Sequence, residues 1–364
     1  MKLRGLDEPK NGHAVRGVPA LDGLRAISIG LVLATHLLPL GPKSLQLNST
    51  AGPMGMSLFF VLSGYLIVST LYSSTILEFI VKRLARILPL AYLYILLVLT
   101  AFGLSKRALL YHIGFIINYR LDQTLPVTEH LWSLCVEVHF YALVAILAAV
   151  GGRRALMIVW PCCLAVTAMR VVNGAHIDVT THLRMDEILA GACIATLRPW
   201  RFRSSATSAS AWALATIIWA ASSHPDSGWL QYLRPYAAGA LLWATISQPP
   251  NRLILLLSSH TLRYVAATSY ALYVFHPLTA HGWWNEGSVW QRYLLKRPLG
   301  FIFTLVAAHA STFYWERVWI QTARSWLRSK THQQVTGRSW QNFRPVTRQP
   351  ICSKRGAPSG SSEP

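Results

Sequence analysis

The sequence has little charge for its length, and acidic residues are especially scarce. Of its 364 residues, 13% are Asp, Glu, Lys or Arg and 52% are hydrophobic, and the mean hydropathy is +0.35. Disordered chains, collagen-like chains and coiled coils need a more polar or more repetitive composition than this. The scarcity of charge also argues against an ordinary soluble protein and favours one that lies in a membrane.

Cysteine is scarce as well. The five cysteines are odd in number, have no paired metal-ligand spacing and lie mostly in apolar stretches (Cys135, Cys162, Cys163, Cys193 and Cys352). We therefore expect reduced packing residues rather than a disulfide framework or a zinc site. The chain also lacks a glycine-rich phosphate loop, a zinc-type His/Glu motif and a Gly-x-Ser-x-Gly elbow, so we expect no bound metal and no permanently bound cofactor.

The charge that is present is strongly unbalanced. Lys and Arg together number 34 and Asp and Glu 14, which gives a net charge of +20. The basic residues lie in short segments between long uncharged runs, where the topology of a membrane protein would put them. This distribution argues against a nucleic-acid partner and makes the lipid bilayer the expected partner.

Ten largely apolar segments are candidates for membrane spans, since about 20 apolar residues cross about 30 Å of hydrocarbon. They are 21–40, 52–72, 87–105, 132–150, 155–168, 186–197, 209–222, 231–247, 264–281 and 299–319. An eleventh segment, 108–119, is shorter and contains His112, so we expect it to be interfacial or re-entrant. The predicted fold class is an all-α, multi-pass integral membrane protein with about ten transmembrane helices.

The distribution of Lys and Arg predicts the orientation. With ten spans and a cytoplasmic N-terminus, basic pairs such as Lys82–Arg83 and Arg153–Arg154 face the cytoplasm, in agreement with the positive-inside rule. An even number of spans also places the C-terminus in the cytoplasm. The predicted organisation is a cytoplasmic segment at 1–20, a transmembrane domain at 21–320 and a basic, disordered cytoplasmic tail at 321–364.

Ionisable side chains within the spans cost about 2.5–3.5 kcal/mol each at a helix centre, so each needs a partner or a function. Arg25 and His36 are eleven residues apart in the first span. This spacing puts them on one helix face, about 16 Å apart along the axis. We expect Arg25 near the inner surface and His36 deep in the membrane, the alternative being a snorkelling arginine and a structural histidine.

Two further segments carry such residues. Arg83 and Arg86 lie one helical turn apart at the cytoplasmic edge, where guanidinium groups suit a pyrophosphate, and ordinary positive-inside arginines are the alternative. Glu137 shares a helix face with Ser133 and Tyr141, each four residues away. Its alternative role is a structural ion pair with an arginine.

Three other features are weaker. Ser63–Gly64 predicts close helix packing, because small residues let helices approach. Arg184, Asp186 and Glu187 cluster at a span boundary, where pairing with one another would satisfy their charges. His276–Pro277 indicates either a kink that lines a cavity or an interfacial histidine.

Five short motifs follow one another along the chain. They are Leu21–Ile27 with His36, Leu58–Ile67, Arg83–Pro89, Trp132–Glu137, and Ser269–Tyr273 with His276–Pro277. Together and in this order they resemble the membrane-bound acyltransferase 3 family, whose members O-acylate surface glycans and other small acceptors. After Glu137 the family often has a second Glu and then Gln, whereas this chain has Val138 and His139, so no role is carried over to that second carboxylate.

The resemblance implies transfer of an acyl group, above all acetyl, from acetyl-CoA or another acyl-CoA to a hydroxyl of a cell-surface or lipid-linked glycan. His36 would be the general base, and Glu137 a second catalytic residue that orients His36 or binds the acceptor hydroxyl. Arg25, Arg83 and Arg86 would hold the phosphates of the donor. The expected location is the plasma membrane, the inner membrane of a bacterium.

Two alternatives to this function stay open. In the first, the same chemistry acts on a small secondary metabolite or a peptide. In the second, buried Arg, Glu and His side chains line the path of a transporter or flippase for a lipid-linked sugar. Consumption of acetyl-CoA with release of a free thiol would distinguish an enzyme from a transporter.

Overall fold

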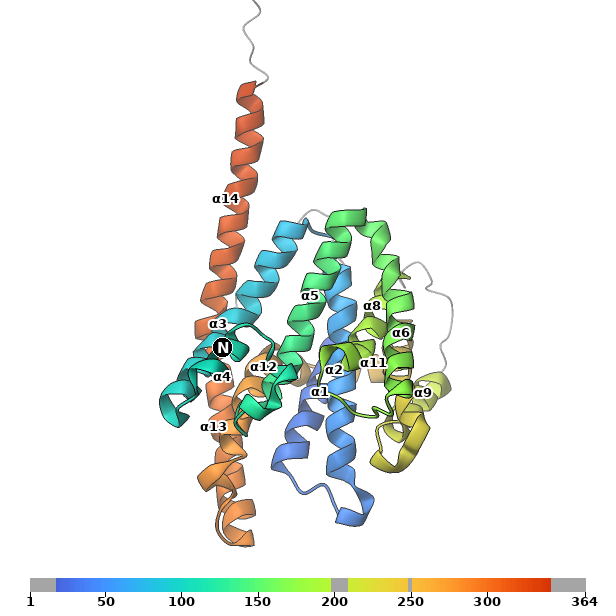
Figure 1. Ribbon diagram of the computed structural model, residues 1–364, viewed down its shortest axis with the longest axis vertical. Helices are drawn as coiled ribbons and strands as arrows, with labels where there is room; N and C mark the ends of the chain where they lie inside the picture. The colour runs from blue at the N-terminus through green and yellow to red at the C-terminus, as the bar shows by residue number, and fades with distance from the viewer. Residues whose placement is uncertain (1–17, 198–208, 248–250, 342–364) are drawn as a thin grey trace, which may run out of the picture. The chain divides into compact units, whose positions relative to one another are not determined.

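A computed structural model of the protein describes residues 18–197, 209–247 and 251–341, and within these ranges every regular element is a helix (Figure 1). The predicted all-α fold class is thus confirmed for the described part of the chain. The predicted N-terminal segment up to residue 17, Cys352 and the tail from 342 lie outside the described residues. The α-helices are α1 (Ala20–Leu37), α2 (Leu47–Tyr72), α3 (Ile76–Phe102), α4 (Lys106–Ile113), α5 (Trp132–Gly151), α6 (Val159–Val172), α7 (Thr181–Arg184), α8 (Asp186–Thr196), α9 (Ala209–Ala221), α10 (Arg234–Ser247), α11 (Arg252–Leu257), α12 (His260–Phe275), α13 (Arg297–Ala310) and α14 (Arg317–Gln341).

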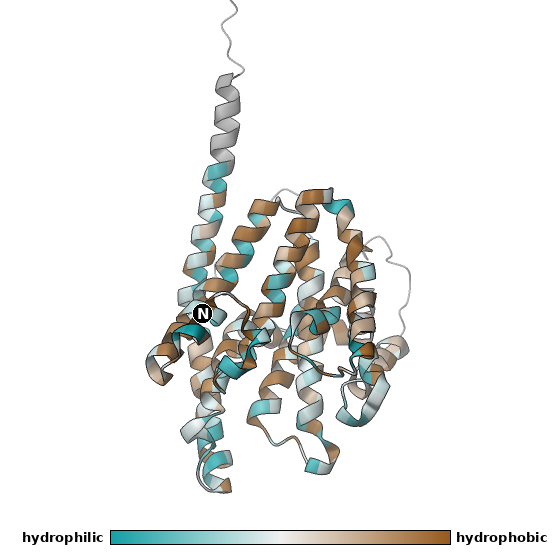
Figure 2. Cartoon of the chain, in the orientation of Figure 1, coloured by the Kyte–Doolittle hydropathy of each residue, from teal (hydrophilic) through white to brown (hydrophobic). Residues whose placement is uncertain are grey.

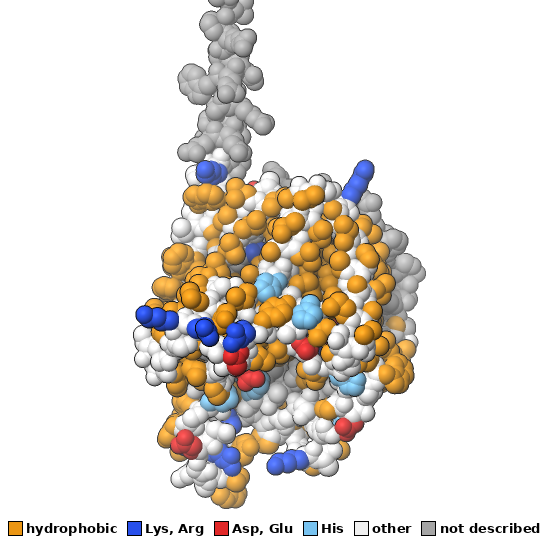
Figure 3. Space-filling model, viewed as in Figure 1, with side chains coloured by type: hydrophobic (Ala, Val, Ile, Leu, Met, Phe, Trp, Pro, Cys, Tyr) orange, Lys and Arg blue, Asp and Glu red, His pale blue; other side chains and the backbone are white. Residues whose placement is uncertain are grey.

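Each of the ten predicted spans is mostly helical, and the eleventh segment contains the short helix α4. Among the described residues, four helical stretches are long and apolar enough to cross a membrane, namely α1, residues 43–72, α3 and residues 129–172. Hydrophobic residues run along the helices (Figure 2), and large hydrophobic side chains cover much of the face shown in Figure 3. These are features of a membrane protein. The count of ten crossings and the cytoplasmic termini stay predictions.

Local sequence explains where the two helices that carry the predicted basic residues begin and end. α1 ends at Leu37, and Leu38 is extended with φ −120° and ψ 145°, because the ring of Pro39 disfavours helical backbone at the residue before it. α3 begins where the Thr75 hydroxyl accepts a hydrogen bond from the Glu78 N–H at 3.2 Å. It ends at Gly103, whose φ of 69° is a left-handed value that glycine adopts without strain.

α2 packs against α1 and against α8 with very close approach of the backbones. A Cβ atom added to Gly64 on α2 would overlap the carbonyl oxygen of Ile188 on α8. A Cβ atom added to Gly191 on α8 would overlap the carbonyl oxygen of Val61 on α2. The close packing predicted from Ser63–Gly64 is therefore confirmed, since no larger residue fits at this crossing.

Five buried charged residues join α6, α7, α8 and α10. Arg170 lies 2.5 Å from the carboxylate of Asp186, while Glu187 pairs with Arg234 at 2.9 Å and with Arg184 at 3.2 Å. The predicted pairing of Arg184 with its neighbours is confirmed for Glu187, whereas Asp186 pairs with an arginine of another helix. Because an unpaired charge in this interior would be strongly unfavourable, the cluster fixes how these helices meet.

The C-terminal part of the chain differs from the prediction. The chain divides into two units, residues 1–323 and 324–364, and α14 continues to Gln341. Residues 324–341 are thus helical, where the sequence predicts a disordered tail from residue 321. The reason lies in a pattern at helical spacing that continues past the last predicted span, through Trp319, Ala323, Trp326 and Leu327.

Candidate active site

Three adjoining cavities are lined mainly by residues of α1, α2, α3, α5 and α12. Figure 1 labels these five helices. α1 packs against both α2 and α12. The first and the last of the five motifs therefore meet in space, although they lie at opposite ends of the region that the motifs cover. The fold thus brings the motifs together around one row of cavities.

The first cavity, which we call the arginine cavity, has a volume of about 490 Å³. Its polar and charged lining residues are Asp22, Arg25, Tyr65, Ser69, Thr70, Ser73, Arg83, Arg86 and Arg263. Four guanidinium groups and a single carboxylate thus surround one open space. Such a cavity suits a ligand with several negative charges, because guanidinium groups match the geometry of phosphate oxygens.

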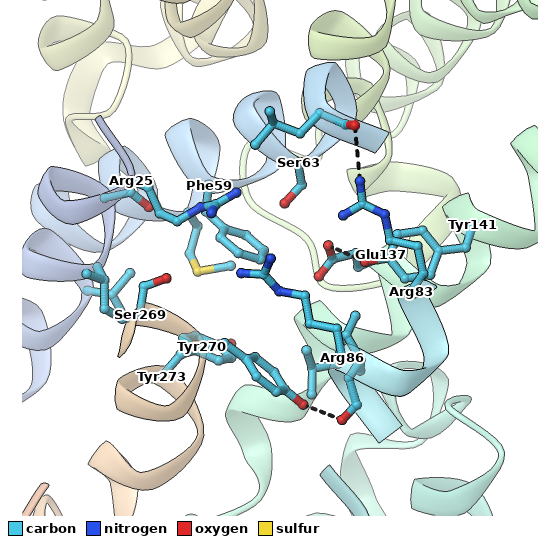
Figure 4. Close-up of a pocket in the computed structure, with 17 residues that line it drawn as sticks. Arg25, Phe59, Ser63, Arg83, Arg86, Glu137, Tyr141, Ser269, Tyr270 and Tyr273 are labelled. Carbon is cyan, nitrogen blue, oxygen red and sulfur yellow. Dashed lines mark hydrogen bonds between the residues drawn. The ribbon is translucent and has the colours of Figure 1, made fainter. Parts of the chain in front are cut away.

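The second cavity, which we call the central cavity, is narrow, with a volume of about 50 Å³. Its labelled lining residues in Figure 4 are Arg25, Phe59, Ser63, Arg83, Arg86, Glu137, Tyr141, Ser269, Tyr270 and Tyr273. Arg25, Arg83 and Arg86 line both this cavity and the arginine cavity. The two spaces therefore adjoin at these three arginines.

The third cavity, which we call the histidine cavity, has a volume of about 240 Å³. Its lining includes His36, Glu129, His130, Trp132, Tyr273, His276 and His281. Val32, Met56 and Tyr273 line both this cavity and the central one. The three cavities therefore form a row that begins among arginines and ends among histidines.

Arg25 and Arg86 point toward one another across the central cavity from α1 and α3 (Figure 4). Both are half-buried, and neither has an ion pair or hydrogen bond to another described residue. Half-buried guanidinium groups that make no direct ion pair favour a nearby anion, so the two side chains are suited to bind one. Arg83 is held in place instead, since it donates hydrogen bonds to the Leu66 carbonyl at 3.0 Å and to the Thr70 hydroxyl at 2.9 Å.

Glu137 is buried on α5 and lines the central cavity among the arginines. Its carboxylate accepts a hydrogen bond from the Tyr141 hydroxyl at 2.7 Å (Figure 4), which confirms that the two residues share a helix face. No ion pair joins Glu137 to an arginine within the described ranges. Glu137 and His36 line different cavities, so a direct orienting contact between them is absent from this part of the chain.

His36 lies in the last turn of α1 and its side chain is exposed. Its depth in the membrane stays a prediction. Pro39 ends the helix just beyond it, and the predicted span 21–40 had counted the residues after Leu37 as helical. The axial separation of His36 from Arg25 nevertheless keeps its predicted value of about 16 Å, because the whole interval is helical.

The structure adds site residues that sequence reasoning missed. Arg263 lines the arginine cavity and His130 the histidine cavity, and the sequence analysis assigned a site role to neither. A further buried carboxylate, Glu316, lines none of the three cavities and lies in the π-helical turn η11 (Ser311–Glu316), where the Ser311 and Thr312 hydroxyls donate to it at 3.2 and 3.3 Å. It is the only acidic residue of the predicted span 299–319, which was a readable signal.

Comparisons with known proteins agree with the motif order. The family model described as an acyltransferase domain matches residues 18–314. A Staphylococcus aureus protein that is provisionally named an O-acetyltransferase is 25% identical, over 79% of this chain and 55% of the relative. Peptidoglycan O-acetyltransferase OatA of Listeria monocytogenes is 24% identical, over 71% of this chain and 49% of its own length.

A Bacillus subtilis protein, YrhL, provisionally named a peptidoglycan O-acetyltransferase, is 27% identical over 72% of this chain and 48% of its own length. The chain spans about half the length of the curated relatives that it matches. No solved structure matches it. Since the family model covers most of the sequence, the chain belongs to the acyltransferase 3 family, and residues 18–314 are its acyltransferase domain.

Proposed function

We propose that the protein transfers an acyl group, above all acetyl, from acyl-CoA to a hydroxyl group of a cell-surface or lipid-linked glycan. The observation that carries the proposal is the pair of half-buried guanidinium groups, Arg25 and Arg86, which make no ion pair or hydrogen bond within the described residues and line both the arginine and the central cavity. Two of the relatives have names that refer to peptidoglycan O-acetylation, which supports a glycan as the acceptor.

The donor would enter through the arginine cavity. The nucleotide part of coenzyme A carries a diphosphate and a further phosphate, and Arg25, Arg83, Arg86 and Arg263 offer four positive charges to them. The thioester arm would then extend through the central cavity. This cavity is narrow, so an arm that fills it would displace water from the reaction path.

The acceptor would enter the histidine cavity from the opposite end of the row. A hydroxyl group is a weak nucleophile at neutral pH, and His36 would take its proton as general base. Glu137 lies among the arginines that would bind the donor. Its carboxylate would partly offset the positive charge of Arg25 and Arg86 while the thioester reacts. The protein would thus join a donor on one side of the membrane to an acceptor on the other.

The same proposal fixes the orientation in the membrane. We place both termini and the mouth of the arginine cavity in the cytoplasm, where acyl-CoA is made, and the protein in the plasma membrane as a multi-pass protein. Lys82 on the exposed surface of α3, beside Arg83, supports this orientation because basic residues gather on the cytoplasmic side.

The test uses membranes of the source organism with and without the protein, supplied with acetyl-CoA labelled in the acetyl group. We expect protein-dependent release of thiol and transfer of label to the glycan fraction. Arg86→Ala should raise KM for acetyl-CoA by about 10- to 100-fold, the effect of losing a charge-assisted hydrogen bond. His36→Ala should lower kcat by about 10²- to 10⁴-fold.

Lys82→Ala is the matched control for Arg86→Ala. It removes a cation from the same helix, but Lys82 is exposed, pairs with Glu78 at 3.4 Å and lines none of the three cavities. Its kinetics should be those of wild type. If the label appeared in a small metabolite or a peptide instead, that molecule and not a glycan would be the acceptor. Failure of the membranes to release thiol from any of a panel of acyl-CoA donors would refute acyl transfer and favour a transporter of a lipid-linked sugar.

A further inference from the structure

Three imidazole rings gather in the histidine cavity, where the ring of His276 contacts the other two. The ring centroid of His276 is 5.1 Å from that of His36 and 5.5 Å from that of His130. The rings come from α1, from the turn η8 (His276–Thr279) and from the turn η4 (Glu129–Leu131). Because His36 and His276 line the same cavity with their rings in contact, a hydroxyl group bound there lies beside both imidazoles.

His276 is held in one orientation and one tautomer. His276 lines the cavity and is only 1% exposed. Its Nδ1 lies 2.7 Å from the carbonyl oxygen of Tyr273. A carbonyl can only accept, so Nδ1 carries the proton and the neutral ring presents the lone pair of Nε2. A hydrogen bond from one imidazole nitrogen to a fixed group keeps a histidine in the tautomer that can act as a general base.

Tyr273, whose carbonyl holds His276, also has a side chain fixed by hydrogen bonds. Its hydroxyl donates to the His130 carbonyl at 2.5 Å and lies 2.7 Å from the Ser133 hydroxyl. The Tyr273 ring also borders both the central and the histidine cavity. His276 is therefore oriented by a rigid structure at the place where the two cavities adjoin.

His36 lacks such support. It is exposed in the last turn of α1, and no hydrogen bond to its ring nitrogens occurs among the residues of the described ranges. Its ring packs against that of His276. A base with no orienting partner is a poor candidate to act alone, because its ring is free to turn.

We propose that His276 is a second catalytic residue, the oriented base of a His36–His276 pair. This inference rests on the proposed acyl transfer. One imidazole of the pair takes the proton of the acceptor hydroxyl while the hydroxyl oxygen bonds to the thioester carbonyl carbon. The carbon–sulfur bond then breaks, and the pair returns the proton to the coenzyme A thiolate. The products are the ester and the free thiol, so no other reactant is needed.

The experiment measures transfer from acetyl-CoA in membranes that contain the native acceptor, for full-length His276→Ala, His276→Asn, His36→Ala and the double alanine variant. His276→Asn keeps an N–H that can donate to the Tyr273 carbonyl but has no basic nitrogen. We expect kcat of both His276 variants to fall by about 10²- to 10⁴-fold with KM for acetyl-CoA within about threefold of wild type. Added imidazole should restore part of the activity of His276→Ala and none of that of a variant that is merely unfolded.

His112→Ala is the matched control. His112 is also 1% exposed, and its Nδ1 also lies 2.7 Å from a backbone carbonyl, that of Ala108, but it lines none of the three cavities. Its kcat per folded molecule should stay at the wild-type value.

A pair that acts as a unit makes the double variant about as slow as the slower single variant. The proposal would be overturned if the reductions in kcat of His36→Ala and His276→Ala multiplied in the double variant. It would also be overturned if His276→Asn had the same kcat as His112→Ala. If wild type itself transferred no acyl group, the proposed function and this inference would both fail, whereas failure at His276 alone leaves the proposed function standing.

Discussion

Replacement of Gly64 by alanine tests the crossing of α2 and α8, on which the central cavity depends. An added Cβ would overlap the Ile188 carbonyl oxygen, and it would lie 2.8 Å from the Ile188 carbonyl carbon and 3.0 Å from the Ala192 nitrogen. Favourable contact needs about 3.5–4.0 Å, so the helices must separate by on the order of 1 Å. All three obstructing atoms belong to the backbone and no side-chain rotation relieves the overlap.

The expected cost is at or above the usual range for an overpacked core, about 1–3 kcal/mol. Two neighbours of Gly64 on α2, Phe59 and Ser63, line the central cavity. A displacement of about 1 Å at a reaction site can lower the rate by about 10²-fold, so Gly64→Ala should lose activity as well as stability.

Gly30→Ala is the matched control for this substitution. Gly30 lies within α1, and a Cβ there would meet no atom within 4 Å. Because alanine is the better helix former, this variant should be more stable than wild type by about 0.5–1 kcal/mol. The two alanine variants should therefore differ by about 2 kcal/mol or more in the free energy of unfolding.

The assay is reversible unfolding of the purified protein in mixed micelles, followed by circular dichroism and supported by the melting temperature. Acetyl-CoA turnover is measured on the same preparations. The packing argument would be refuted if Gly64→Ala and Gly30→Ala unfolded with free energies within about 0.5 kcal/mol of each other, a difference typical of surface substitutions.

Three further outcomes are expected. Asp186→Ala, which leaves a buried arginine without its partner, should cost about 3–5 kcal/mol in the same unfolding assay, against less than about 1 kcal/mol for Asp122→Ala, which breaks an exposed pair. Arg263→Ala should raise KM for acetyl-CoA by about 3- to 10-fold, less than Arg86→Ala does, because Arg263 is exposed. The increase in KM should be smaller in high salt, and an unchanged KM would exclude Arg263 from the donor site. Tyr273→Phe keeps the ring but loses the hydroxyl that bonds the His130 carbonyl and Ser133, and should cost about 1–3 kcal/mol by thermal unfolding; a neutral result would mean that this bond contributes nothing.

Residues that interact within one helix could be assigned from sequence. Glu137 and Tyr141 lie four residues apart, and the predicted shared face is seen as a hydrogen bond. Arg83 and Arg86 likewise lie together along one side of the site because the helical period alone relates them. The interval from Arg25 to His36 is helical throughout, so its length followed from the residue count.

Errors arose where one residue changes the backbone or where a pattern was cut short. Pro39 ends α1 at Leu37, short of the predicted end of the span at residue 40. The tail predicted from residue 321 contains the continuation of α14 to Gln341, because apolar residues at helical spacing persist among the charges. Pro39 and the apolar spacing are both visible in the sequence, but the predicted ends of the span and of the tail followed average composition instead.

Which distant residues meet was decided only in three dimensions. Periodicity relates residues a few positions apart, whereas the contact between His36 and His276 depends on α1 packing against α12. The same holds for Arg263, which joins Arg25, Arg83 and Arg86 around one cavity. The sequence by itself determined a helical, lipid-compatible chain with its ionisable residues on particular helix faces, because those properties are local. The tertiary structure alone decided that these faces enclose one row of cavities from arginines to histidines, because helix packing, and not sequence spacing, sets distances between helices.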